Sequence, residues 1–176
     1  MKRKQQIYVI GSLALLGTLA TVYFTTKMKK KEFDARTERE LASLEPHVES
    51  AARLFLTAAR KLGIDLRITS GRRDCAHQNR LYAQGRTTPG NIVTKAKCGQ
   101  SAHNYGLAID VVEFVDSQPV WETPNWEKIG QLGEQYGFTW GGRWTRFVDR
   151  PHFEMLGGNT INSLYEKYQQ TGVLKA

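Results

Sequence analysis

The sequence is poor in cysteine and proline, and over most of its length it has almost no surplus of charge. Two cysteines in 176 residues are too few for a disulfide scaffold or a four-cysteine zinc site. Five prolines and sixteen glycines exclude a collagen or a low-complexity filament. With 40% apolar and 10% aromatic residues the chain can bury a core, which excludes wholesale disorder. Its length suits one domain of ordinary size with a short segment attached.

The positive charge is concentrated at the N-terminus. The formal net charge is +8, but residues 1–31 hold seven basic residues and no acidic one. Removing these seven from the 25 basic residues of the chain leaves 18 against 17 acidic residues, a net charge of +1 for residues 32–176. A nucleic-acid-binding domain needs a basic face for phosphate, so we expect no nucleic-acid partner.

Residues 7–26 form a run of twenty residues without a charge, preceded by three basic residues. As a helix this run is about 30 Å long, the thickness of the hydrocarbon core of a bilayer. It is either a cleavable signal peptide or an uncleaved anchor. Tyr23 and Phe24 at its end suit a membrane interface and favour the anchor. We therefore expect residues 1–31 to be a transmembrane segment with basic flanks.

The rest of the chain mixes helix and strand patterns. Residues 32–40 are polar and predict a short tether to a domain spanning 41–176. Apolar spacings of three and four predict a helix over 44–62. Further helices are expected over 74–84, 126–136 and 159–170, the last capped by Asn159. Strands are expected over 66–69, 106–114, 137–140 and 151–156, and a loop over 85–100. Without strict alternation of strand and helix, this predicts an α+β fold with a small, mostly antiparallel sheet flanked by helices.

A carboxylate stands in the middle of the expected strand 106–114. Asp110 lies there between apolar neighbours, where an ionised carboxylate is costly unless a cation or several donors compensate it. One explanation is a salt bridge with a core arginine, and the other is a metal ion. His103, seven residues upstream, and His152 would complete a set of two imidazoles and one carboxylate. That set, with a fourth position left to water, is typical of a catalytic zinc site.

Two further carboxylates lie close to His152 in the sequence. Asp149 precedes it by three residues and could accept a proton from a zinc-activated water. Glu154 would share a strand face with His152 and could orient the imidazole, or it is an ordinary surface carboxylate.

Four motifs in order resemble one family of enzymes. Residues 101–110 (SAHNYGLAID) match the SxHxxGxAxD pattern of the D-alanyl-D-alanine carboxypeptidase-like (VanY-like) zinc peptidases. Residues 68–73 (ITSGRR) are similar to that family's SGYR segment, with Arg72 in place of the aromatic residue. Residues 140–144 (WGGRW) and 149–154 (DRPHFE) resemble the ending of the L-alanyl-D-glutamate endopeptidase subgroup of cell-wall turnover enzymes and phage endolysins.

The resemblance implies a fold like that of the hedgehog domain and the D-Ala-D-Ala peptidases, and a zinc ion with three ligands: His103, Asp110 and His152. It implies that Asp149 is the base. Arg73 matches the family arginine that contacts substrate and stabilises developing negative charge. Ser101 is a weaker candidate for contact with substrate. Because Arg72 replaces an aromatic residue, the sequence leaves open which of the two arginines faces the site.

Cys75 lies before the long loop over residues 85–100, and Cys98 lies near the end of that loop. They are either two free thiols or a disulfide, and export of the domain by the anchor favours the disulfide. Such a bridge closes a loop of about 23 residues and stabilises the fold by about 3 kcal/mol on the chain-entropy argument. Two tryptophans, Trp140 and Trp144, either wall the cleft or fill the core, and for Trp140 the core is favoured.

The sequence therefore predicts a monomeric, membrane-anchored zinc metallopeptidase that hydrolyses peptidoglycan stem peptides at the L-alanyl-D-glutamate bond. We expect a single pass through the bacterial cytoplasmic (inner) membrane, with the catalytic domain facing the periplasm or the cell wall. One alternative is a D,D- or L,D-carboxypeptidase acting on the same stems. Another is a zinc-containing domain that binds the wall without catalysis. A prophage endolysin with a releasable anchor would use the same chemistry.

Overall fold

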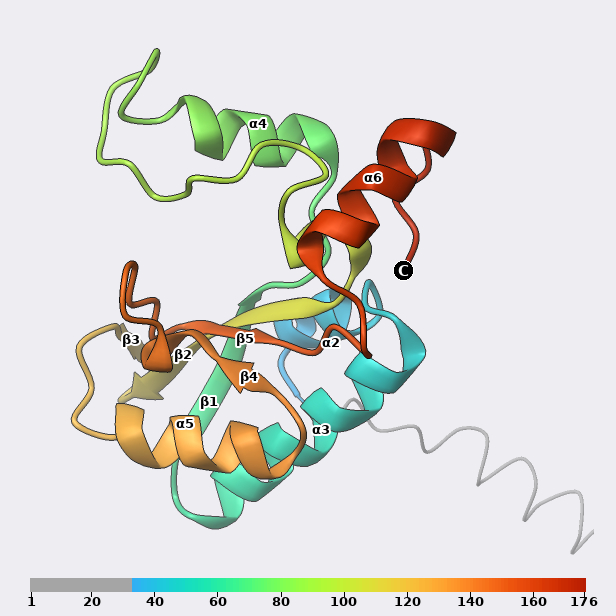
Figure 1. Cartoon of the computed structure of the whole chain (residues 1–176). Helices are drawn as coiled ribbons and strands as arrows, with labels where there is room; N and C mark the ends of the chain where they lie inside the picture. The colour runs from blue at the N-terminus through green and yellow to red at the C-terminus, as the bar shows by residue number, and fades with distance from the viewer. Residues whose placement is uncertain (1–32) are drawn as a thin grey trace, which may run out of the picture. The chain divides into compact units, whose positions relative to one another are not determined.

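The computed structural model describes residues 33–176 (Figure 1). The predicted membrane segment, residues 1–31, lies outside the described residues. Within residues 33–176 no helix combines the length and the apolar character that crossing a bilayer requires. The described part of the chain from Asp34 onward forms one unit.

The centre of this unit is a five-stranded sheet in which every pairing is antiparallel. The strand order is β1-β2-β5-β4, and β3 pairs with β2 beyond this path. The small antiparallel sheet expected from the sequence is thus confirmed. The strands are β1 (Asp65–Ser70), β2 (Ala108–Val115), β3 (Gln118–Val120), β4 (Thr139–Trp140) and β5 (His152–Glu154).

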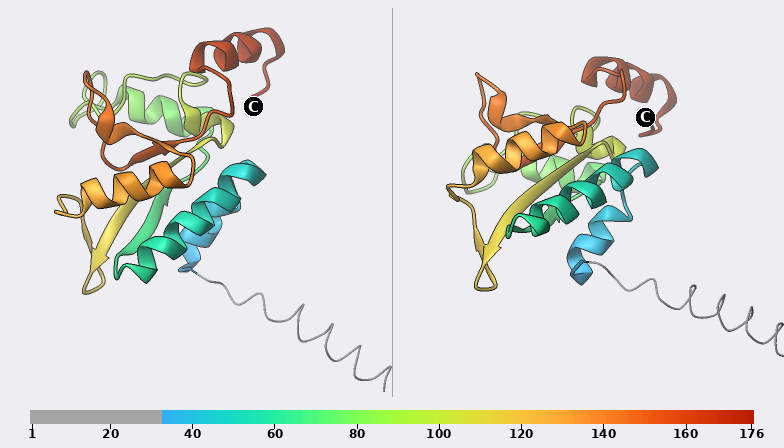
Figure 2. Two further views of the ribbon diagram at one scale, coloured as in Figure 1. Left: turned by 60° about the horizontal axis from the view of Figure 1, so that its bottom comes forward. Right: turned by 90° about the horizontal axis from the view of Figure 1, so that it is seen from below.

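Helices cover both sides of the sheet. α3 and α5 lie on one side, and α4 with the long loop that follows it lies on the other (Figures 1 and 2). The apolar core packs between the sheet and the first pair, where Phe55, Ile129 and Phe153 are fully buried. The helices are α2 (Ala35–Leu41), α3 (Pro46–Lys61), α4 (Cys75–Ala83), α5 (Trp126–Gln135) and α6 (Ile161–Thr171), with short 3₁₀ turns η1 (Ala102–Tyr105) and η2 (Gly141–Arg143).

The predicted tether over residues 32–40 is wrong, because α2 begins at Ala35. The side chain of Asp34 caps this helix by accepting hydrogen bonds from the backbone N–H groups of Arg36 and Thr37. Thr37 and Leu41 are fully buried, four residues apart and therefore on one face of the helix. The charged residues between them hid this buried face in the sequence.

Two smaller expectations also differ from the structure. A hairpin joins β2 to β3 through Asp116 and Ser117, both with positive φ, and β3 was not expected. Its polar, proline-containing sequence lacks the apolar alternation of a strand, but the turn imposes the pairing. The final helix is capped by Thr160, whose hydroxyl accepts a backbone N–H bond, and not by Asn159.

The sheet register positions the side chains that carry charge. Asp110 on the central strand β2 pairs with His152 on β5 and with Ser70 at the end of β1. Directly opposite residues in an antiparallel pair bring their Cβ atoms to within about 5 Å of each other. The fold therefore brings the carboxylate and one imidazole together through strand pairing alone.

Candidate metal centre

The structure brings His103, Asp110 and His152 to one point. The Nε2 atom of His103 lies 3.2 Å from Oδ1 of Asp110 and 3.2 Å from Nδ1 of His152. The third edge of this triangle, from Nδ1 of His152 to Oδ1 of Asp110, is also 3.2 Å. His103 comes from the η1 turn, which delivers it beside the two strand residues.

Each imidazole has its other nitrogen engaged, which fixes its tautomer. Nδ1 of His103 donates to the carbonyl oxygen of Gly71 at 2.7 Å. Nε2 of His152 donates to a carboxylate oxygen of Glu154 at 3.1 Å. The remaining nitrogen of each ring faces the shared position and is the one that would bind a metal ion, an orientation that hydrogen-bond partners of metal-binding histidines commonly impose. Glu154 has the orienting geometry that the sequence suggested.

The triangle fits a zinc ion. A tetrahedral zinc ion with bonds of about 2.0–2.1 Å to nitrogen and oxygen needs its ligand atoms about 3.3 Å apart. The three edges of 3.2 Å match this requirement, and the donor set of two imidazoles and one carboxylate is one that zinc accepts. The three side chains also line an open cleft, so a fourth position would face the solvent side.

Burial and neighbouring charges set the protonation states of these ligands. Burial alone would raise the pKa of Asp110, but His103, His152 and Arg73 outweigh it and hold that pKa well below its usual range. Burial lowers the pKa of His103. Burial opposes the charged form of His152 too, yet hydrogen bonds to Asp110 and Glu154 raise its pKa to about 9. Asp110 is therefore ionised, and a metal ion that binds here would displace the proton that His152 shares with this carboxylate.

Arg73, and not Arg72, lies in the site. Its guanidinium pairs with Oδ2 of Asp110, and its Nε donates to the hydroxyl of Ser70 at 2.8 Å. Asp110 therefore turns one oxygen to the arginine and the other to the imidazoles. Arg72 is exposed and donates to the carbonyl oxygen of Leu174 at 2.6 Å, away from the ligands.

Asp149 lines the same cleft and is half-buried. Its pKa is raised, first by burial and then by the negative charge of Asp110. A tight turn holds it next to the metal ligand: the backbone N–H of Asp149 donates to Gly141, and the N–H of His152 donates to Asp149. A Cβ atom at Gly141 would lie 2.5 Å from the carbonyl oxygen of Asp149, so this position requires glycine.

The cleft encloses about 660 Å³, a size typical of ligand sites. Ser101 lines it, as does Trp144, whereas Trp140 is buried in the core. Sequence reasoning missed other residues that form its walls, chiefly three: Lys95, Trp121 and Phe147. The only signal in the sequence for Trp121 and Phe147 was the presence of large aromatic residues in polar, loop-forming segments, and Lys95 gave none.

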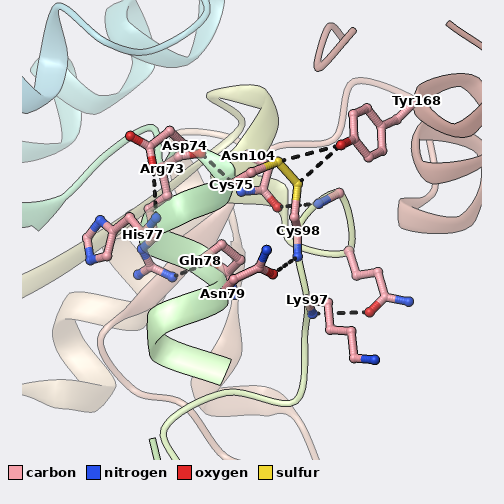
Figure 3. The surroundings of a disulfide bond; sticks show 12 residues. Arg73, Asp74, Cys75, His77, Gln78, Asn79, Lys97, Cys98, Asn104 and Tyr168 are labelled. Atoms are coloured by element: carbon pink, nitrogen blue, oxygen red, sulfur yellow. Dashed lines mark hydrogen bonds between the residues drawn. A yellow bond between two sulfur atoms is a disulfide. The ribbon is translucent and has the colours of Figure 1, made fainter. Parts of the chain in front are cut away.

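A disulfide joins Cys75 at the start of α4 to Cys98 (Figure 3). The hydroxyl of Tyr168 on α6 lies 3.5 Å from the sulfur of Cys98 and 3.7 Å from that of Cys75. The residues just before Cys98 form one wall of the cleft. Gln78 on α4 supports this wall by donating from Nε2 to the carbonyl oxygen of Ala96 at 2.8 Å.

A site of two histidines and one carboxylate at the floor of an open cleft is the arrangement of catalytic zinc hydrolases. Comparison with known proteins identifies the family within that class. Residues 94–155 match the family described as D-alanyl-D-alanine carboxypeptidase. Over 125 residues the chain is 42% identical to the peptidoglycan L-alanyl-D-glutamate endopeptidase CwlK of Bacillus subtilis (strain 168), covering 65% of this chain and 75% of CwlK. The chain belongs to this family of VanY-like peptidases, in its endopeptidase subgroup.

Solved structures share the fold. The L-Ala D-Glu endopeptidase ChiX of Serratia marcescens superposes with a TM-score of 0.55 at 23% identity, over 73% of this chain and 94% of ChiX. The vancomycin resistance D,D-pentapeptidase VanY, solved in complex with Zn(II), gives a TM-score of 0.51 at 17% identity, over 70% of this chain and 78% of VanY.

Proposed function

We propose that the protein is a zinc-dependent endopeptidase that hydrolyses the L-alanyl-D-glutamate bond of peptidoglycan stem peptides. The observation that carries this proposal is the triangle of ligand atoms from His103, Asp110 and His152 at the floor of the cleft. The 42% identity to an enzyme named for this bond supports the choice of substrate.

Zinc bound by these three residues would supply Lewis acidity at the scissile carbonyl and would acidify the attacking water. The protein holds the ligands ready for it, because the sheet fixes Asp110 and His152 and the carbonyl of Gly71 fixes the ring of His103. Such preorganisation avoids rearrangement when substrate binds.

Asp149 is the general base in this proposal. As a carboxylate in the cleft it would take one proton from the water that attacks the scissile carbonyl carbon. It would then give that proton to the amine that leaves when the C–N bond breaks. Its raised pKa makes the protonated form a more accessible intermediate state than it would be for an exposed aspartate.

Arg73 has a positioning role and a proposed substrate contact. Its bond to Asp110 keeps one carboxylate oxygen directed at the imidazoles. Because Arg73 also lines the cleft, its remaining N–H groups can stabilise negative charge that develops on a substrate oxygen. Ser101 lines the same cleft and is the second proposed contact.

The test is digestion of purified muropeptides by the full-length chain supplied with zinc, followed by mass spectrometry. We expect peptide fragments that begin with D-glutamate. Asp149→Asn, which keeps the size of the side chain, should lower kcat by about 10²–10⁴-fold. Absence of cleavage with zinc bound would refute the proposal, and full activity of the variant would refute the role of Asp149.

A D,D- or L,D-carboxypeptidase is the second candidate, because the family that matches residues 94–155 is described by a carboxypeptidase activity. The same digest distinguishes it, since a carboxypeptidase would release free D-alanine instead. A domain that only binds the wall would sediment with peptidoglycan and release neither product.

We also propose that residues 1–31 anchor the chain in the bacterial cytoplasmic membrane, with the domain as a monomer on the outer side. The uncharged run in the sequence and the Cys75–Cys98 disulfide, which suits an oxidising compartment, support this location. Fractionation of cells and the mass of the mature chain would separate an anchor from a cleaved signal peptide, and sedimentation would give the oligomeric state.

A further inference from the structure

The cleft has an aromatic wall that the hydrolysis itself does not use. Within residues 33–176 the two most exposed aromatic side chains are Trp121, with 50% of its surface exposed, and Phe147, with 38%. Both line the cleft that contains the metal ligands. A third aromatic residue, Trp144, lies between core and surface and lines the cleft too.

This wall begins beside the metal ligands. The ring of Trp144 lies 5.0 Å from the ring of His152, measured between centroids. Phe147 follows three residues later on the same segment. Trp121 comes from the connection between β3 and α5, and its neighbour Glu122 lies 3.7 Å from Arg150, next to the same segment. The three aromatic side chains thus line the cleft that holds the chemical centre, and Trp144 lies beside one of its ligands.

A second part of the cleft lining has a different character. It comes from the loop before the disulfide and includes Val93, Thr94 and Lys95. The ammonium group of Lys95 lies 5.4 Å from the ring centroid of Phe147, so the two parts of the lining meet at this contact. The three side chains of the aromatic wall, Trp121, Trp144 and Phe147, are all neutral.

Exposed aromatic side chains next to a catalytic centre indicate a ligand with an apolar face. The faces of a pyranose ring are covered with C–H groups, while its hydroxyl and amide groups lie around the edge. A neutral hexosamine therefore matches the apolar surface of this wall. The carboxylates of a stem peptide instead match the positive charges of Arg73 and Lys95, which line other parts of the cleft.

Cleavage at the proposed scissile bond would place a sugar of the substrate close to the metal ligands. In peptidoglycan the amino group of the stem's L-alanine is bonded to the lactyl group of muramic acid. One residue spans at most about 3.6 Å, so the lactyl group begins within about that distance of the scissile carbonyl and the sugar ring follows. A cleft that cuts after this L-alanine must accommodate the sugar next to the metal ligands.

We propose that Trp121 and Phe147, continuing from Trp144, form a subsite for the amino-sugar residues of the glycan strand, and that this makes the enzyme prefer glycan-linked stems over free peptides. The proposal rests on the proposed function, since that function fixes which substrate residue lies beside the wall.

The test compares two substrates of the full-length chain with zinc: a disaccharide-tetrapeptide, and the same tetrapeptide acetylated on its L-alanine. We expect the disaccharide form to have the higher kcat/KM by about tenfold, the effect of an aromatic contact of ordinary strength. Trp121→Ala and Phe147→Ala should each bring the ratio toward one by raising the KM of the disaccharide form more than that of the acetylated peptide. Trp121→Phe should retain most of the preference.

A direct binding measurement separates failure of this proposal from failure of the proposed function. The GlcNAc-MurNAc disaccharide without peptide is titrated against the protein, and binding is followed by isothermal titration calorimetry. Saturable binding that Trp121→Ala removes supports the subsite even if no stem is cleaved. No binding, or a substrate ratio of one in the unaltered enzyme, would overturn it, as would a preference that survives Trp121→Ala.

Two controls address folding and nonspecific effects. The backbone carbonyl of Trp121 accepts a hydrogen bond from Nε1 of Trp126, and Trp121→Ala leaves that bond in place. Val115 on the β2–β3 hairpin is also 50% exposed but does not line the cleft. Val115→Ala should therefore change neither the ratio nor the binding, and a loss there would assign the effect to general destabilisation.

Discussion

Reduction of the Cys75–Cys98 disulfide should destabilise the domain much more than it disturbs the metal ligands. The two cysteines are 23 residues apart in the sequence. On the chain-entropy argument, opening a loop of this length costs about 3 kcal/mol of folding free energy. For a domain of this size, 1 kcal/mol corresponds to a change in Tm of about 2–4 °C, so we expect a decrease of about 6–12 °C.

The loop has other attachments that remain after reduction. Gln78 donates to the carbonyl oxygen of Ala96. The side chain of Asn79 accepts from the backbone N–H of Cys98 at 3.0 Å (Figure 3). Arg86 also donates to the carbonyl oxygen of Thr94 at 3.0 Å. At 25 °C these bonds should keep the cleft wall in place, so zinc affinity should change little and KM should rise only moderately.

The assay is thermal unfolding with and without a thiol reductant, run beside a Cys75→Ser, Cys98→Ser double variant. Reductant should lower the Tm of the unaltered protein to that of the double variant and should not change the Tm of the variant. Tyr168→Phe removes the hydroxyl that contacts both sulfur atoms and serves as a control for local packing. A decrease of less than about 2 °C on full reduction would refute the loop-closure reasoning.

Three further predictions concern single side chains. Glu154→Gln should weaken zinc binding about 10–100-fold in a competition titration, because the imidazole of His152 loses its charged partner, and unchanged affinity would contradict that role. Gly141→Ala should displace Asp149, which the new Cβ atom would meet at 2.5 Å, and should lower kcat more than it weakens zinc binding, since His152 is met only at 3.2 Å. Equal kcat would mean that the turn tolerates a Cβ atom. Burial opposes ionisation of Asp34, but hydrogen bonds from Thr37 and Arg36 lower its pKa. The stabilisation that Asp34 gives as a helix cap is therefore complete above the unfolded pKa and is lost as pH falls through the lower folded pKa. Asp34→Ala should cost about 1 kcal/mol at pH 7 and less at pH 3, whereas Asp34→Asn should cost little at either pH.

The sequence supported the site better than the connections around it. His103, Asp110 and His152 were recognisable because a motif of fixed spacing surrounds Asp110 and because a carboxylate inside an apolar strand demands compensation. The choice between Arg72 and Arg73 was open, since it depends on the direction in which β1 enters the turn before α4. The structure answers it through the pairing of Arg73 with Asp110.

Other features depend on contacts between distant segments and left little trace in the sequence. Helix α2 has only two buried positions among charged residues, so its packing against β1 could not be seen in composition. Strand β3 forms because a turn with positive φ at Asp116 and Ser117 returns the chain to β2. The aromatic wall joins residues more than 20 positions apart, and no local pattern links Trp121 to Phe147.

The sheet and the loops have different roles in the site: the sheet positions the metal ligands, and the loops form the walls of the cleft. Asp110 and His152 are paired across two strands, and His103 is fixed by a backbone carbonyl, so the metal ligands depend on the most deeply buried part of the fold. The walls of the cleft come from the loop before Cys98 and from the segment after Trp144, which contact each other through Lys95 and Phe147. Substitutions in the walls should therefore change which stem is preferred while zinc affinity stays constant, because the elements that hold the ion do not include them.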